Sequence, residues 1–109
     1  MNAVKEDVEK LVQKELESAN QRFPMFRSDH EGAAVIFEEI EEAKTELEEI
    51  DDDFHNLWCL VKDNDIRSST YAGWVFKSSI RLACEAIQVS AMAQKFIDSQ
   101  KEREKSEGN

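Results

Sequence analysis

The sequence predicts an all-α protein, and three observations support this prediction. Only 3 Gly and 1 Pro occur among 109 residues, so few positions favour turns. The alternation of apolar and polar residues that marks a half-buried strand is almost absent. Apolar residues recur instead at helical spacing, and a hydrophobic content of 40% is enough for one modest core. We therefore expect one helical domain over residues 1–99, built as an antiparallel bundle.

The first helix is expected over about residues 3–20, where apolar residues recur between Lys and Glu: Val4, Val8, Leu11, Val12, Leu16 and Ala19. Pro24 then ends the helix, because it disfavours helical geometry at Phe23. The rings of Phe23 and Phe26 have two interpretations. They either close one end of the bundle, or form a wall on which a flat ligand such as a nucleobase stacks.

The second helix is expected over about residues 29–62, with Ser28 or Asp29 as its N-cap. It carries an apolar seam at alternating steps of three and four residues: Ile36, Ile40, Ala43, Leu47, Ile50, Phe54, Leu57 and Val61. This spacing places the seam on one helix face, which predicts that the seam is core. The three aspartates at 51–53 are poor helix interior, so we expect a bend or a break there.

The third helix is expected over about residues 71–99, after a polar connector at 63–70. Its middle is rich in small and apolar residues, so most of its faces should be buried. Glu85 and Gln88 differ from this background, because neither is tolerated in apolar surroundings without a partner. The tail at 100–109 has no apolar residue and is expected to be disordered.

The formal net charge of −10 excludes some classes of partner. A strongly acidic protein is repelled by the nucleic-acid backbone and by an anionic membrane surface, so we expect neither as a partner. The sequence contains no secretory signal pattern and no stretch of about 18 apolar residues, which predicts a cytoplasmic location. The same charge suits a protein that collects divalent cations.

Carboxylates beside the seam indicate a candidate metal site. Glu39 and Glu42 are three residues apart on the second helix, and Glu85 and Gln88 are three residues apart on the third. If these helices pack antiparallel, the four side chains converge into an all-oxygen site, which suits Mg²⁺ or Mn²⁺ rather than zinc. The alternative is that the acidic residues of the second helix are simply its solvated face.

Three segments resemble the MazG-like branch of the all-α nucleoside triphosphate pyrophosphohydrolases: RFPMF at 22–26, HEGAAVIFEEIEE at 30–42 and AIQVSAMAQKF at 86–96. That family carries a Glu-Glu-x-x-Glu box on one helix and a Glu-x-x-Asp box on a later helix. The first box is matched by Glu38, Glu39 and Glu42, and the first position of the second box by Glu85. Gln88 stands at the position of the family's Asp, where it offers a carbonyl oxygen but no negative charge.

The resemblance implies hydrolysis of a nucleoside triphosphate between its α and β phosphates, giving a monophosphate and pyrophosphate. It implies Mg²⁺ or Mn²⁺ ligands at Glu39, Glu42 and Glu85, with Gln88 as a weaker ligand. It also implies a catalytic role for Glu38, as the base that positions water or as a further ligand. The competing hypothesis is a catalytically degenerate helical oligomer that acts as a binding or regulatory protein.

Three cations of the third helix lie towards one side of the Glu85 face: Lys77, Arg81 and Lys95. They either meet substrate phosphates or act as ordinary surface charge. On the other side, Ile80, Ile87 and Ala91 point away from Glu85. Because three helices of this size leave apolar surface unburied, we expect a homodimer or homotetramer. Oligomerisation would then complete a bundle of the all-α pyrophosphohydrolase type.

Overall fold

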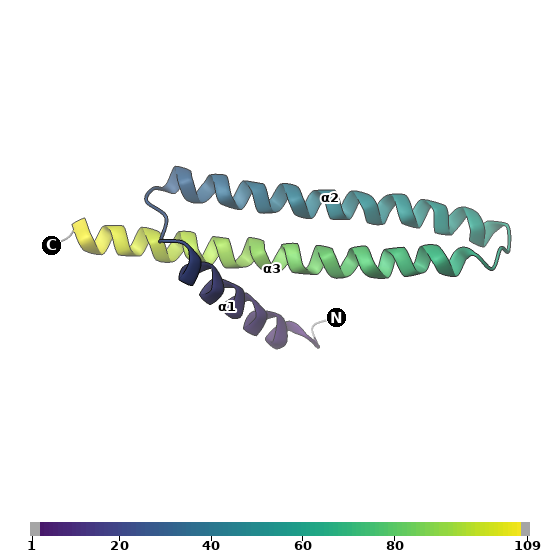
Figure 1. Cartoon of the computed structure of the whole chain (residues 1–109), viewed down its shortest axis with the longest axis horizontal. Coiled ribbons are helices and arrows are strands. Elements are labelled where there is room, and N and C mark those ends of the chain that lie inside the picture. Colours follow the sequence, from purple (N-terminus) through teal and green to yellow (C-terminus); the bar gives the residue numbers. More distant parts are fainter. Residues whose placement is uncertain (1–2, 108–109) are drawn as a thin grey trace. The chain divides into compact units, whose positions relative to one another are not determined.

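The computed structural model describes residues 3–107 and contains three α-helices (Figure 1). Helix α1 spans Lys5–Arg22, α2 spans Asp29–Lys62 and α3 spans Ser68–Glu107. No strand occurs within residues 3–107, so the prediction of an all-α protein is confirmed. None of these described helices is both long enough and apolar enough to cross a membrane.

Helix α3 extends beyond the bounds that the sequence predicts. It begins at Ser68 rather than near residue 71, and it continues to Glu107 through most of the tail that we expected to be disordered. Side chains attach this extension to the start of α2. Arg103 donates hydrogen bonds to the Phe26 carbonyl oxygen, at 2.8 Å, and to the carboxylate of Asp29. Gln100 also donates to Asp29, at 3.2 Å.

The start of α2 is capped as predicted. The Oγ atom of Ser28 accepts a hydrogen bond from the backbone N–H of Glu31, at 3.1 Å. The Glu31 carboxylate in turn accepts a hydrogen bond from the backbone N–H of Arg27, at 3.3 Å. The first bond satisfies an amide group that the first turn leaves without a helical partner, and the second ties the residue before Ser28 to the helix. The helix then runs unbroken through the three aspartates at 51–53.

The chain divides into two compact units. Unit 1 comprises Met1–Ile40 and Ala86–Asn109, and unit 2 comprises Glu41–Glu85. Unit 1 therefore contains α1, the first part of α2 and the second part of α3. Unit 2 contains the remaining parts of α2 and α3, which both continue through the boundary without interruption.

The core of unit 1 joins α1, the connector that follows it, and α3. Its buried apolar residues, each at most 9% exposed, are Leu16, Phe26, Ala91 and Met92. Partly buried residues packed against them are Val12, Ala19, Val35, Ile36 and Phe96. Helix α2 approaches this core closely at Gly32, where an added Cβ would lie 2.6 Å from the Phe96 ring and 2.9 Å from the Phe26 ring. A glycine is therefore required at this approach.

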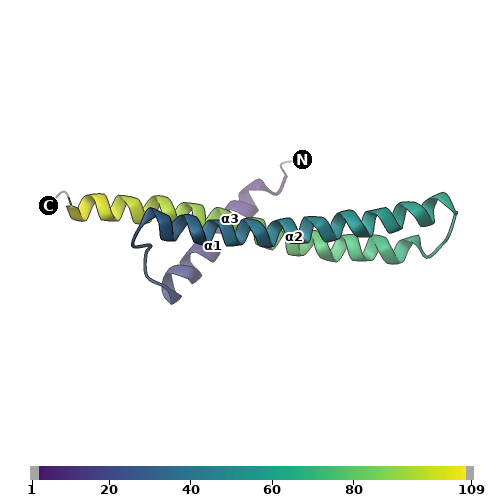
Figure 2. The same cartoon turned by 90° about the horizontal axis from the view of Figure 1, so that it is seen from above.

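Unit 2 is an antiparallel pair of helices joined by a short connector (Figure 2). Within residues 41–85, all of which the structure describes, Ser78 is the only buried residue. Seam residues Ile50 and Leu57 are half-buried, whereas Leu47 and Phe54 are exposed. The prediction that the whole seam is core is therefore wrong for the single chain. Helical spacing correctly groups the seam on one side of α2, but α3 covers only part of that side.

The connector of unit 2 is closed by a local ion pair. Arg67 donates hydrogen bonds to Asp65 through its guanidinium group, at 2.6–3.1 Å, and through its backbone N–H, at 2.9 Å. The side-chain bonds, followed by the backbone bond, lower the pKa of Asp65 to about 2. Asn64 adopts a left-handed φ of 54°, which Asn tolerates better than most residues. The predicted polar connector is therefore a tight turn that ends where α3 begins.

The two helical glycines give a matched test of the packing in unit 1. We expect Gly32→Ala to lower the free energy of unfolding by about 1–3 kcal/mol, because the new methyl group overlaps two packed rings. Gly73→Ala should instead raise it by about 0.5–1 kcal/mol, since nothing lies within 4 Å of the added carbon and Ala favours helix. Urea denaturation followed by circular dichroism measures both changes. Equal effects of the two substitutions would contradict the close approach of α2 at Gly32.

Candidate functional site

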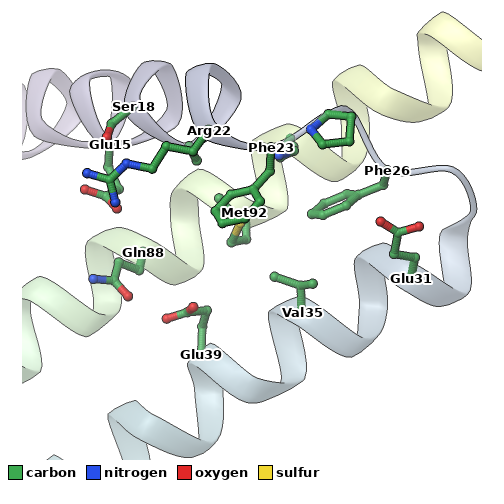
Figure 3. A pocket seen from close by; sticks show the side chains of 13 residues that line it. Glu15, Ser18, Arg22, Phe23, Phe26, Glu31, Val35, Glu39, Gln88 and Met92 are labelled. Atoms are coloured by element: carbon green, nitrogen blue, oxygen red, sulfur yellow. The ribbon is translucent and has the colours of Figure 1, made fainter.

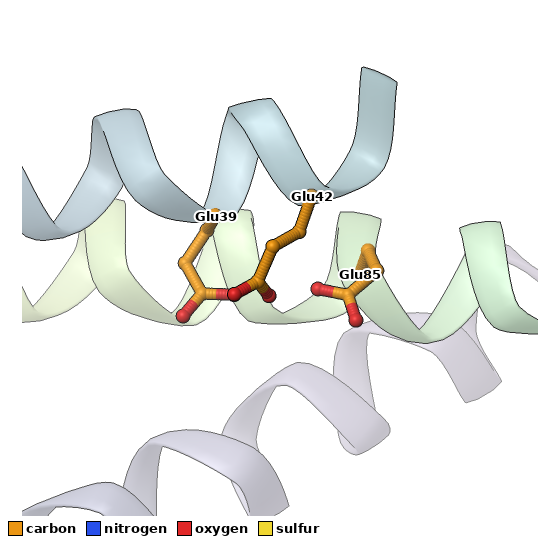
Figure 4. A group of neighbouring side chains, drawn as sticks. All are labelled: Glu39, Glu42 and Glu85. Carbon is orange, nitrogen blue, oxygen red and sulfur yellow. The ribbon is translucent and has the colours of Figure 1, made fainter. Parts of the chain in front are cut away.

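Three of the predicted metal-binding side chains lie together (Figure 4). One carboxylate oxygen from each of Glu39, Glu42 and Glu85 lies within 4.8 Å of the other two. Glu42 and Glu85 both belong to unit 2, and Glu39 precedes Glu42 by one turn of the uninterrupted helix α2. One oxygen of Glu39 and one of Glu85 are shielded from solvent, whereas Glu42 is exposed. We call these three residues the carboxylate cluster.

The chemistry of the carboxylate cluster fits a hard divalent cation. Negative charges this close repel one another, and a bound cation would offset the repulsion. All the donor atoms are oxygens, which Mg²⁺ and Mn²⁺ prefer. Because Mg²⁺ binds oxygen at about 2.1 Å, two of its ligand atoms are at most about 4.2 Å apart. Small side-chain rotations would bring oxygens that lie within 4.8 Å of one another to such spacing.

A pocket of about 370 Å³ in unit 1 includes Glu39 in its lining (Figure 3). The pocket is lined by Glu15, Ser18, Ala19, Arg22, Phe23, Pro24, Phe26, Glu31, Val35, Glu39, Gln88, Met92 and Lys95. In the view of Figure 3, Glu39 and Gln88 lie towards one end, whereas Phe26 and Glu31 lie towards the other. The pocket therefore combines aromatic and aliphatic walls with charged groups of both signs, as small-molecule sites commonly do.

Lys95 is a buried cation in this pocket. The residue is only 2% exposed, and its Nζ atom lies 5.0 Å from the centroid of the Phe26 ring. Burial lowers the pKa of Lys95, and the charge of Glu31 partly offsets this effect. Among residues 3–107, the Lys95 ammonium thus interacts with the Phe26 ring and with the charge of Glu31. Lys95 therefore contributes a buried positive charge to the lining of the pocket.

The other two predicted phosphate-binding cations lie in unit 2 and do not line this pocket. Arg81 donates hydrogen bonds to the carboxylates of Glu46, at 3.0 Å, and Glu49, at 3.1 Å. These bonds raise the pKa of Arg81. The Nζ atom of Lys77 lies 5.0 Å from the centroid of the Trp74 ring. Both cations are thus engaged with side chains of their own unit.

Of the other predicted residues, Phe23 and Phe26 both line the pocket, and Phe26 is also part of the core. Gln88 is half-buried and lines the pocket with Glu39. Glu38 is exposed and is outside both the carboxylate cluster and the pocket lining, since adjacent helical residues point about 100° apart.

The sequence reasoning missed the contribution of α1. Glu15, Ser18 and Arg22 all line the pocket. Their steps of three and four residues place them on one face of α1, and this spacing was the available signal. The pattern alone does not show which part of the protein that face meets.

Comparisons with protein-family models, with curated proteins and with solved structures found no match. The resemblance to the MazG-like enzymes therefore stays a prediction.

Burial of Lys95 has a consequence for stability that depends on pH. Because the pKa of Lys95 is lowered in the folded protein, the folded state binds the ammonium proton less tightly than the unfolded chain does. The charged lysine therefore lowers the free energy of unfolding at neutral pH. We expect Lys95→Met to raise the free energy of unfolding at pH 7. The gain should shrink as the pH rises through the ordinary lysine pKa of 10.5, where the unfolded chain also loses the proton.

Urea denaturation at pH 7 and near pH 11 measures this difference. Lys101→Met, at an exposed position, is the control and should change stability little at either pH. A gain from Lys95→Met that is the same at both pH values would contradict the burial of a charged lysine.

Proposed function

We propose that the protein hydrolyses nucleoside triphosphates to monophosphate and pyrophosphate, using Mg²⁺ or Mn²⁺ held by Glu39, Glu42 and Glu85. The observation that carries the proposal is the convergence of these three carboxylates, contributed by two helices, within 4.8 Å of one another. The resemblance to the MazG-like enzymes leads to the same reaction. The proposal includes a cytoplasmic location.

Each member of the carboxylate cluster would supply oxygen ligands to the cation. A bound Mg²⁺ supplies positive charge for phosphate oxygens and makes a water molecule more acidic. The three carboxylates would occupy some of the coordination positions of the ion, and a phosphate would bind at the remaining positions. Because Glu42 is exposed, phosphates would enter from its side of the cluster. Two shielded oxygens on Glu39 and Glu85 would hold the ion on its inner side.

The attacking water would be positioned beside Glu39. Gln88 lines the same pocket as Glu39, and its amide oxygen can accept a hydrogen bond from water or contact the cation. Gln88 carries no charge, so it is a weaker ligand and a weaker base than a carboxylate. We assign the positioning of water to Gln88 in preference to Glu38, because Glu38 lies outside the carboxylate cluster and the pocket.

The pocket of unit 1 is the proposed binding site for the nucleoside part of the substrate. The exposed ring of Phe23 suits a planar base, which gains from stacking on aromatic rings, and Phe26 contributes to the apolar wall beside it. Arg22 and Lys95 are donors that suit ring carbonyl or ring nitrogen acceptors, and Glu31 is an acceptor that suits an amino group. Because Glu39 belongs to both the pocket and the carboxylate cluster, base and phosphates would occupy adjoining space.

The second candidate function is a binding or regulatory role without catalysis. It is favoured by Gln88, because an uncharged amide at this position weakens both cation binding and the activation of water. In this case the protein would keep the pocket and the helical surface for partners. Cation binding without turnover would distinguish this function from the first.

An assay of pyrophosphate release tests the first proposal. We expect release from at least one nucleoside triphosphate in the presence of Mg²⁺, and a loss of about 100-fold or more in Glu85→Gln, which removes a ligand charge but keeps the shape. Glu48→Gln, on the exposed side of α2, is the control and should retain activity. Equal rates for Glu85→Gln and the wild type would contradict the proposed role of the carboxylate cluster.

Restoring a carboxylate at residue 88 separates the two candidate functions. Under the first proposal, Gln88→Asp should tighten Mg²⁺ binding by about tenfold, since a carboxylate adds a charged ligand. Calorimetric titration with Mg²⁺ measures this change, and the release assay is run in parallel. Turnover that appears only in Gln88→Asp would favour the degenerate, non-catalytic protein. An unchanged Mg²⁺ affinity would show that residue 88 does not reach the cation.

A further inference from the structure

Helix α2 carries a second regular row of side chains. The row, here called the outer row, consists of Phe37, Ile40, Lys44, Leu47, Asp51, Phe54, Trp58 and Val61. Its steps alternate between three and four residues, which is the spacing of a coiled-coil seam. Five of its apolar members are between 45% and 60% exposed, and only Ile40 is half-buried. A seam of this kind normally packs against another helix.

The outer row explains why the predicted core seam is not fully covered. The two rows share Ile40, Leu47, Phe54 and Val61. The remaining members of the core seam include Ile50 and Leu57, which are half-buried. Among the shared residues, Leu47, Phe54 and Val61 are exposed, so they lie on the side of α2 that the chain itself leaves open to solvent.

The outer row is complementary to itself when it is reversed. Every seventh residue reads Phe37, Lys44, Asp51 and Trp58: an aromatic ring, a cation, an anion and an aromatic ring. Two copies of α2 that lie antiparallel about a two-fold axis near Leu47 would place Lys44 beside Asp51 of the second copy. Phe37 would then lie beside Trp58 of the second copy. Symmetry makes each of these contacts twice, as an isologous interface requires.

The two charged residues of the outer row favour the antiparallel direction. Two parallel copies would place Lys44 beside Lys44 and Asp51 beside Asp51, and like charges in contact disfavour such pairing. Lys44 is one of only two lysines in α2, and the helix contains no arginine. Its ion pair within the chain, with Glu41 at 3.4 Å, is exposed and therefore weak. Lys44 can exchange this partner for Asp51 of a second copy at little cost.

An apolar hollow at one end of the outer row fits the residue that the antiparallel arrangement brings there. In unit 1 the hollow measures about 490 Å³ and is lined by Ala33, Ile36, Phe37, Ile40, Ala93, Phe96 and Ile97. Trp58 of the second copy, placed beside Phe37, would reach this hollow. A large indole ring matches an apolar cavity that no polar side chain lines.

We propose that α2 packs antiparallel against α2 of a second copy along the outer row, so that the protein is a homodimer. The interface would extend over about 30 Å, from Phe37 to Trp58, at 1.5 Å per helical residue. It uses none of the residues of the carboxylate cluster. A negative result for the dimer would therefore not argue against the proposed hydrolysis, and a negative result for hydrolysis would not argue against the dimer.

Sedimentation equilibrium of the full chain tests the proposal through charge reversal. The wild type should be a dimer at micromolar concentration. Lys44→Glu and Asp51→Lys should each weaken the dimer by about tenfold, since each turns two attractive contacts into repulsive ones. The double variant with both changes should recover an affinity within about threefold of the wild type. An equimolar mixture of the two single variants should form a heterodimer, because both of its cross-chain pairs are attractive.

Asp63→Lys and Lys101→Glu make the same charge changes at exposed positions outside the outer row and should leave the dimer intact. Circular dichroism checks that each variant is still folded. We expect every variant to fold, because the altered side chains are exposed. A wild type that is monomeric throughout the micromolar range would overturn the proposal. A double variant that is as weak as the single variants would also overturn it.

Discussion

The attachment of Phe26 to α3 is the interaction on which unit 1 depends. The backbone N–H of Phe26 donates a hydrogen bond to Ser99 Oγ, at 3.0 Å, and its carbonyl oxygen accepts one from Arg103, at 2.8 Å. Its ring is buried beneath the Lys95 ammonium and next to Gly32. Since the connector follows α1 and precedes α2, fixing Phe26 fixes the end of one helix and the start of the next. The same ring forms part of the pocket wall, so Phe26 contributes both to the core of unit 1 and to the pocket.

The helices could be predicted from the sequence because their signals are local. Apolar spacing and the polar cap at Ser28 need only neighbouring residues, and the structure agrees with both. The end of α3 could not be predicted in this way, because Arg103 is held by Phe26 and Asp29, which are far away in the sequence. Likewise, periodicity groups Leu47 and Phe54 on one side of α2 but does not show what covers that side.

The candidate site was predictable to a similar extent. Glu39, Glu42 and Glu85 lie together because helical spacing and antiparallel pairing are enough to bring them together. The part of the pocket formed by α1 required knowledge of tertiary packing, since nothing local shows which face of α1 meets the core. The two cations in unit 2 interact with side chains of their own unit: Lys77 with the Trp74 ring and Arg81 with the Glu46 carboxylate. In a chain this acidic, several carboxylates can pair with each lysine or arginine, and sequence spacing does not predict which of these pairs forms.

We propose that Glu39, Glu42 and Glu85 are held together to bind a divalent cation. Anomalous diffraction from crystals soaked with Mn²⁺ tests it most directly, because Mn²⁺ scatters anomalously and takes the same oxygen ligands as Mg²⁺. We expect one strong peak in contact with carboxylate oxygens of Glu39, Glu42 and Glu85, and we expect no such peak in crystals of Glu85→Gln. A map with no peak among these three residues, at a Mn²⁺ concentration that labels other sites, would contradict it.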